Sequence, residues 1–163
     1  MKESSLYLIT FLIEGNRFAF PLQDVEKVIQ AVAFREIPDT SDWIDGVIDF
    51  HGVIVPLLNL RKRFRMPERS LAVHDQIIIV NSDQRKMAVS VDKVGAVQTV
   101  NKADLVAISL EKAGHSNKKH KSDLTHDTVL LRDNDGVVII YQLHQLVNTD
   151  VMVELDRIFL KEN

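Results

Sequence analysis

The stretch GVIDFHGVIVPLLNLR, residues 46–61, has two short apolar runs on either side of His51-Gly52 and ends in a polar Asn-Leu-Arg. The two-residue turns that fit twisted strands need positive φ at their central positions, which glycine adopts freely and histidine tolerates. Pro56 cannot donate a ladder hydrogen bond, so the second strand is expected to end, or to lie at a sheet edge, near that residue. The stretch predicts a β-hairpin with His51 at an exposed tip, where another protein can recognise it.

Similar apolar runs recur between turn signals along the chain, which indicates a mainly β protein. Met87, Val89 and Val91 alternate with Ala88 and Ser90, the pattern of a strand with one buried face and one face of small side chains. Closing a sheet on itself removes unpaired edges, so this many strands in 163 residues favour small barrels. The runs are 6–13, 17–20, 47–50, 53–58, 76–80, 86–91, 96–100, 129–131 and 137–141.

Near the N-terminus, one segment has helical periodicity. Pro21 can occupy a first helical turn, and Leu22, Val25, Val28 and Ile29 then gather on one side. We therefore expect a short helix that begins close to Pro21.

A second helix is expected at the C-terminus, where Thr149 or Asp150 can cap a segment with an apolar stripe. Such stripes are usually part of a core, so docking on the protein's own strands is favoured over a free recruitment peptide. The stripe consists of Val151, Met152, Leu155, Ile158 and Phe159.

Residues 111–127 interrupt the apolar pattern with glycine, serine, asparagine and lysine, which predicts a flexible loop. The segment after it is too short for a core of its own, so residues 1–163 are expected to form one domain. A weak internal repeat agrees with this, because the apolar runs after His51-Gly52 and Asp135-Gly136 both end in an amide residue followed by leucine. Each of the two similar segments is expected to be a β-hairpin whose second strand ends at a polar amide residue.

Composition excludes several classes of function. The formal net charge of −3 gives no basic excess for nucleic acid or an anionic membrane surface, so the expected partners are proteins. No apolar window is long enough to cross a bilayer, and the absence of cysteine suits a reducing, cytoplasmic compartment. The spacing of the six glycines provides no phosphate cradle. We expect no cofactor and no enzymatic activity.

Metal binding is the competing hypothesis, because His115, His120 and His126 share one loop. Three lysines among them would repel a divalent cation, and ordering the loop would cost entropy. A metal- or small-ligand-binding barrel that uses loop 115–126 therefore remains the alternative. Residues 133–136, Asp-Asn-Asp-Gly, are better explained as a hairpin turn than as a calcium loop, because the required flanking carboxylates are missing.

Four segments together are similar, in order and spacing, to the CheW family of chemotaxis coupling proteins. They read FAFPLQDVEKVI, WIDGVIDFHGVIVPLLNLRKRF, QIIIVNSDQRKMAVSVDKVGAVQTV and LLRDNDGVVIIYQLHQLV, and they cover nearly the whole chain. The positions that match the family pattern are Gly46, Val47, Gly52, Val55, Pro56, Leu60, Arg61, Val91, Asp92 and Val94.

The resemblance implies two small SH3-like, five-stranded β-barrels with a hydrophobic groove between them. It also implies an adaptor that joins the cytoplasmic tip of a chemoreceptor to the regulatory domain of a CheA-type histidine kinase. On the family pattern, Val25 and Val28 contribute to the receptor-facing groove. The expected protein-binding residues are Val25, Val28, Asp49, His51 and Arg61.

Several positions depart from the family pattern. His51 stands where the family usually has arginine, and histidine lacks the permanent charge and planar fork of arginine. Asp49 replaces the usual asparagine, Asn59 the usual aspartate, and Lys27 an acidic residue. These departures suggest changed partners, as in a paralogue that serves a pilus or another chemosensory pathway.

Overall fold

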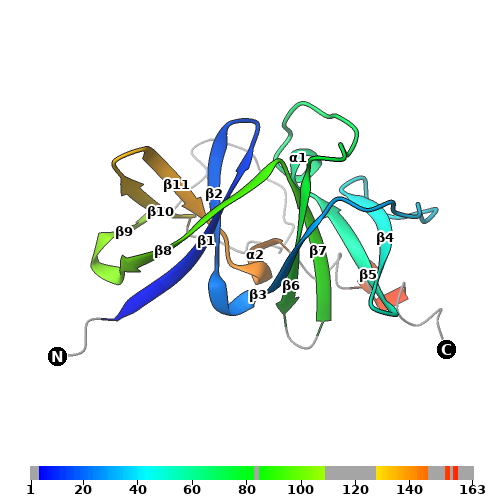
Figure 1. Ribbon diagram of the computed structural model, residues 1–163, viewed down its shortest axis with the longest axis horizontal. Helices are drawn as coiled ribbons and strands as arrows, with labels where there is room; N and C mark the ends of the chain where they lie inside the picture. Colours follow the sequence, from blue (N-terminus) through cyan, green and yellow to red (C-terminus); the bar gives the residue numbers. More distant parts are fainter. Residues whose placement is uncertain (1–3, 83–84, 109–127, 147–152, 155, 158–163) are drawn as a thin grey trace, which may run out of the picture.

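The computed structural model describes residues 4–82, 85–108, 128–146, 153–154 and 156–157, and most of these form two sheets that lie side by side (Figure 1). The first sheet contains β1 (Ser5–Ile13), β2 (Asn16–Pro21), β8 (Lys93–Asn101), β9 (Leu105–Ile108), β10 (Thr128–Asp133) and β11 (Gly136–Ile140). The second contains β3 (Val25–Gln30), β4 (Ile44–Phe50), β5 (Val53–Asn59), β6 (Gln76–Ser82) and β7 (Arg85–Val91). Short helical segments among the described residues include η1 (Leu22–Asp24), η2 (Lys102–Asp104), α1 (Leu60–Arg63) and α2 (Leu143–Leu146).

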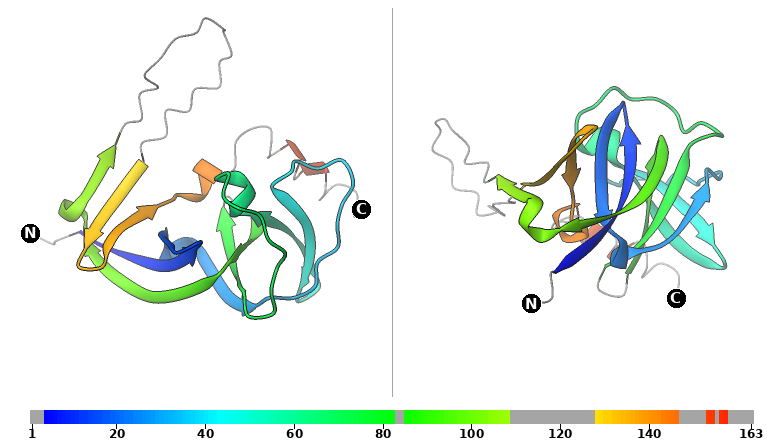
Figure 2. Two further views of the ribbon diagram at one scale, coloured as in Figure 1. Left: turned by 90° about the horizontal axis from the view of Figure 1, so that it is seen from above. Right: turned by 60° about the vertical axis from the view of Figure 1, so that its left-hand side comes forward.

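The five-stranded sheet is inserted in the chain between the two parts of the six-stranded sheet. Their orders are β8-β1-β2-β11-β10-β9 and β3-β6-β7-β5-β4. Strand β3 follows β2 in the chain but pairs with β6, and β8 follows β7 but pairs with β1. The chain therefore crosses between the sheets at η1 and again at Asp92, so the five-stranded sheet comes from the continuous segment β3 to β7, whereas the six-stranded sheet combines β1 and β2 with β8 to β11 (Figures 1 and 2).

The two similar sequence segments form similar structures, as predicted. Hairpin β4–β5 and hairpin β10–β11 each lie beside a parallel neighbour, β7 and β2 respectively. Each hairpin is followed by one helical turn, which begins at the buried residues Leu60 and Leu143. The amide-Leu pairs of the sequence mark these strand-to-helix junctions.

The hairpin turn at His51-Gly52 is confirmed, with φ of 51° at His51 and 82° at Gly52. The expectation for Pro56 was wrong, because β5 continues to Asn59 and lies between β4 and β7. Pro56 is opposite Val47, whose N–H and C=O both bond Arg35 and so point away from β5. The nitrogen of Pro56 therefore points away from β4, and the pairing with β7 begins only at Leu57, so no ladder bond is lost.

Apolar side chains form three layers, which explains why runs such as residues 76–80 are apolar on both faces. One layer lies inside each curved sheet. The third, the inter-sheet core, takes side chains from both sheets. Its buried members are Ile9, Phe11, Ile13, Phe18, Phe20, Ile44, Val47, Leu58, Leu60, Ile78, Val80, Met87, Val89, Val91, Leu143 and Leu146.

The predicted N-terminal helix was wrong. The structure has the single turn η1 followed by the strand β3, and Val25 and Val28 lie on the strand. A register shift between Val25 and Lys27 places Val25 opposite Val80 and Val28 opposite Ile78. A bulge therefore gives residues three apart a common face, which the sequence pattern could not distinguish from a helix.

The expected closed barrels are replaced, in the pairing of the described residues, by two open sheets. For the C-terminal helix, Val153, Glu154, Asp156 and Arg157 are helical, and Glu154 accepts hydrogen bonds from Ser41. The rest of that helix and the predicted flexible loop 111–127 lie outside the described residues.

Candidate functional site

A cleft of about 580 Å³ lies where the two sheets meet, beside η1. Its apolar lining is buried or half-buried, whereas four of its five polar residues are exposed, so the cleft has an apolar floor and a polar rim. The floor consists of Leu6, Pro21, Leu105, Val129, Ile140 and Leu143. The rim consists of Gln23, Asp24, Asn81, Lys102 and Gln142. Such a surface fits an apolar stripe with polar flanks.

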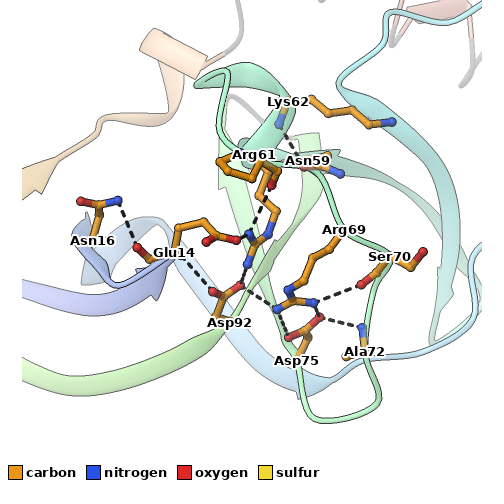
Figure 3. A network of polar contacts seen from close by, with 11 residues as sticks. Glu14, Asn16, Asn59, Arg61, Lys62, Arg69, Ser70, Ala72, Asp75 and Asp92 are labelled. Carbon is orange, nitrogen blue, oxygen red and sulfur yellow. Dashed lines mark hydrogen bonds and ion pairs between the residues drawn. The ribbon is translucent and has the colours of Figure 1, made fainter.

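A network of charged side chains, which we term the polar junction, lies at the other end of the boundary between the sheets (Figure 3). Strand β1 connects the two places, because Leu6 lines the cleft and Glu14, just beyond the strand, belongs to the junction. This stretch of extended chain is about 26 Å long at roughly 3.3 Å per residue.

The junction is built around Arg61, whose side chain is only 8% exposed. Its guanidinium forms ion pairs with Glu14, from the β1–β2 turn, and with Asp92, between β7 and β8. Arg69 bonds both carboxylate oxygens of Asp75, at 2.6 and 2.7 Å, and reaches Asp92 Oδ1 at 2.9 Å. Two guanidiniums and three carboxylates, distant from one another in the sequence for the most part, are therefore brought together at one point.

The guanidinium of Arg69 lowers the pKa of the Asp75 carboxyl below its ordinary value of 3.8, against the opposing effect of burial. Hydrogen bonding to Asp75 raises the pKa of Arg69 in turn. Both side chains are therefore charged at neutral pH.

Asn59 has a local reason for replacing the usual aspartate. Its side-chain oxygen accepts from Lys62 N at 3.2 Å and caps α1 (Figure 3). Its Nδ2 donates to Asp45 at 3.0 Å. An aspartate at position 59 can accept the capping bond but cannot donate to Asp45. Asn59 and Asp45 are therefore a matched pair.

The β4–β5 tip is held by Asp49, whose Oδ1 accepts from Gly52 N at 2.7 Å. His51 is exposed and its ring meets the ring of Phe50 edge-on, with centroids 4.5 Å apart. Lys86 lies 5.8 Å from the Phe50 centroid and pairs with Glu26 Oε1 at 2.7 Å. Hydrogen bonds from Lys86 and Asn81 lower the pKa of Glu26.

The structure separates the five predicted site residues. Asp49 and His51 lie together at the hairpin tip, and Val25 and Val28 pack half-buried against the inter-sheet core. Arg61 lies in the polar junction, where its guanidinium is occupied by Glu14 and Asp92 and is largely inaccessible to a partner.

The residues that line the cleft were missed by sequence analysis. They come from β1, β2, η1, β6, η2, β9 to β11 and α2, and no local pattern indicates that these segments meet. The predicted apolar runs 6–13, 129–131 and 137–141 contain the lining residues Leu6, Val129 and Ile140, but nothing in those runs indicates that they face one cleft.

The Asp-Asn-Asp-Gly segment is a hairpin turn, as predicted, between β10 and β11. Arg17 donates to both oxygens of Asp133 at 2.7 Å, which lowers the pKa of that carboxyl to about 2. Across the part of the chain that the structure describes, no three His, Asp or Glu side chains are grouped so as to hold a metal ion. His115, His120 and His126 lie outside it.

Together, the two linked sheets, the lined cleft and the exposed hairpin tip define a mainly β domain of the binding-module class. The family model for the CheW-like domain matches residues 7–151. This chain therefore belongs to the CheW-like domain family.

Several known proteins are similar to the chain. The chemotaxis protein CheW of Treponema pallidum is 21% identical over 159 residues, which cover 95% of this chain and 89% of that protein. The chemotaxis protein CheW of Thermotoga maritima is 29% identical over 138 residues, 82% of each chain. The crystal structure of the scaffolding protein TtCheW from Thermoanaerobacter tengcongensis matches with a TM-score of 0.72 and 24% identity, covering 91% of this chain and 96% of that one. That last likeness supports the fold.

Within the described residues, no helix has the length and apolar character needed to span a membrane.

Proposed function

We propose that this protein is a non-enzymatic, cytoplasmic adaptor that couples a chemoreceptor tip to the regulatory domain of a CheA-type histidine kinase. Membership of the CheW-like family and the chemotaxis relatives support this. In this proposal each curved sheet is the equivalent of one SH3-like barrel. Holding two partners on one rigid body raises their effective concentration and biases the kinase between its states.

The observation that carries the proposal is the apolar-floored cleft between the sheets. A chemoreceptor tip presents helices, and an amphipathic helix binds by laying its apolar stripe into such a trough. Val25 and Val28 adjoin this place, since η1 lines the cleft and leads directly into β3. Polar rim residues such as Lys102 and Gln23 then contact the flanks of the helix.

The kinase is assigned to the exposed β4–β5 tip. The turn is fixed by the Asp49 bond to Gly52, so His51 projects from a rigid support. Arg61 affects partner binding indirectly, because its side chain is buried and holds α1 against the β1–β2 turn. It contributes to binding by keeping the surrounding protein surface in shape, without contacting the partner.

The test is reconstitution with the receptor-tip fragment and the CheA-type kinase of the same organism, followed by co-sedimentation and kinase autophosphorylation. The matched variants are Leu105→Gln, which alters the cleft floor, and Val106→Gln, on the next residue of β9, which is 54% exposed and does not line the cleft. We expect receptor binding to fall for Leu105→Gln alone. Equal binding by both variants, or no complex with the unaltered chain, would overturn the proposal.

A further inference from the structure

Asp92 occupies one of the two points where the chain crosses between the sheets, between β7 and β8. Its backbone N–H donates to Leu12 O at 2.9 Å, and its Oδ2 accepts from Glu14 N at 2.9 Å. Its Oδ1 accepts from Arg61, of α1, and from Arg69, at 2.9 Å. One carboxylate thus joins the β1–β2 turn of the six-stranded sheet to two segments attached to the five-stranded sheet.

The inter-sheet core alone does not fix the angle between the sheets. Most of its members are aliphatic, and contacts between aliphatic side chains are non-directional, so packed layers can slide by small shears. Charge-assisted hydrogen bonds, in contrast, require particular directions and short distances. The polar junction therefore supplies the directional constraint on how the sheets are oriented.

The cleft lies at the far end of the same boundary. Leu6 and Glu14 lie toward opposite ends of β1, and Asn81 and Gln76 lie toward opposite ends of β6. Over about 26 Å of strand, at roughly 3.3 Å per residue, a tilt of about 5° moves the far end by about 2 Å. A shift of that size is enough to alter the fit of a helix in the cleft.

We propose that Asp92 is a positioning residue for the cleft: by holding Glu14, Arg61 and Arg69 at one end of the inter-sheet boundary, it sets the width of the binding cleft at the other end. The biological meaning rests on the proposed receptor function. The mechanical statement does not, because cleft width can be measured with no partner present.

The experiment measures the distance between two spin labels across the cleft by pulsed electron resonance. The chain has no cysteine, so Lys27→Cys on β3 and Ala103→Cys on η2, both exposed positions, give a unique label pair. With Asp92→Asn we expect the distance distribution to shift or broaden. With Glu14→Gln, which removes one arm of the junction, we expect a smaller change in the same direction.

Two controls separate positioning from loss of stability. Asp133→Asn breaks the Arg17–Asp133 ion pair inside the six-stranded sheet, and Ile79→Val weakens the core inside the five-stranded sheet. Neither is expected to change the distribution, whereas Asp92→Glu should restore it in part. Melting curves establish that each variant is folded.

An unchanged distribution in folded Asp92→Asn overturns the inference, and so does any control that changes it equally. If Asp92→Asn does not fold, Glu14→Gln decides the question by the same criterion. In a second arm, a receptor-tip fragment is titrated, and we expect several-fold weaker binding to Asp92→Asn. Failure of the unaltered chain to bind the fragment would count against the proposed function alone.

Discussion

The two ends of the inter-sheet boundary contrast sharply. At one end, Arg61 and its partners bring five charged groups together, and the side chain of Arg61 is 8% exposed. At the other end, apolar side chains of the six-stranded sheet and α2, together with Asn81 from the five-stranded sheet, line a cleft of about 580 Å³. The same strands thus run from a closed, charged end to an open, apolar end. Residues at the closed end are expected to act on stability and geometry, and residues at the open end on binding.

The largest expected effect is at the closed end. Arg61→Leu removes a nearly buried cation, which leaves Glu14 without this partner and Asp92 with Arg69, and it is expected to cost about 3 kcal/mol of unfolding free energy. Lys102→Leu, on the exposed rim of the cleft, is expected to change it by less than about 0.5 kcal/mol. Urea unfolding checks both values. Similar losses for the two variants would remove the contrast between the ends.

A charge beside the open end is expected to act on binding. Val25→Asp places a carboxylate where a half-buried apolar side chain adjoins the cleft, and we expect receptor-tip affinity to fall by about 2 kcal/mol. Lys27→Ala, on the same strand but exposed, serves as the matched control. Calorimetric titration gives the affinities, and circular dichroism shows whether each variant is folded. Unaltered affinity in folded Val25→Asp would exclude Val25 from the site.

The closed end is also expected to weaken in acid. The folded pKa of Asp75 lies below its ordinary value of 3.8, chiefly because Arg69 donates to it, so its stabilising contribution is present above about pH 4 and is lost as pH falls further. In Asp75→Asn the unfolding free energy should therefore fall less steeply with acid than in the unaltered chain. Parallel pH profiles of the two proteins, measured by denaturant unfolding, would contradict this.

The smallest expected effect is at the hairpin tip, which belongs to neither end of the boundary. His51→Arg restores a permanent charge at an exposed position and is expected to strengthen binding to a conventional kinase regulatory domain by about 0.5 kcal/mol. Stability should not rise, since residue 51 has a φ of 51° that arginine adopts no more easily. Surface plasmon resonance measures the difference. An unchanged dissociation constant would retire the idea that position 51 still serves the family contact.

Much of the fold follows from local sequence patterns. The His51-Gly52 turn and the two similar hairpins were predictable because turn chemistry and strand alternation are local. The β3 bulge was not, since a three-residue spacing gives one face in a helix and also in a bulged strand. Arg61 shows a similar limit: its position in the family pattern was visible, but its burial between Glu14 and Asp92 depends on segments far apart in the chain.

Gly46 illustrates a constraint that no sequence pattern explains by itself. Its φ is 154°, and a Cβ there would lie 2.2 Å from the carbonyl oxygen of Arg35, which bonds Val47. The glycine of the family pattern is therefore required by the close approach of the segment that covers the edge of β4. The cleft lining is less predictable still, because its side chains come from nine helices and strands and share no motif.

The most direct test of the difference between the polar junction and the binding cleft is hydrogen–deuterium exchange of the full chain, with and without a receptor-tip fragment of its own organism. The account predicts new protection in the backbone around the cleft, in η1, η2 and β9. It predicts no new protection at the β1–β2 turn or α1. Protection confined to the polar junction, or none anywhere at saturating fragment, would contradict it.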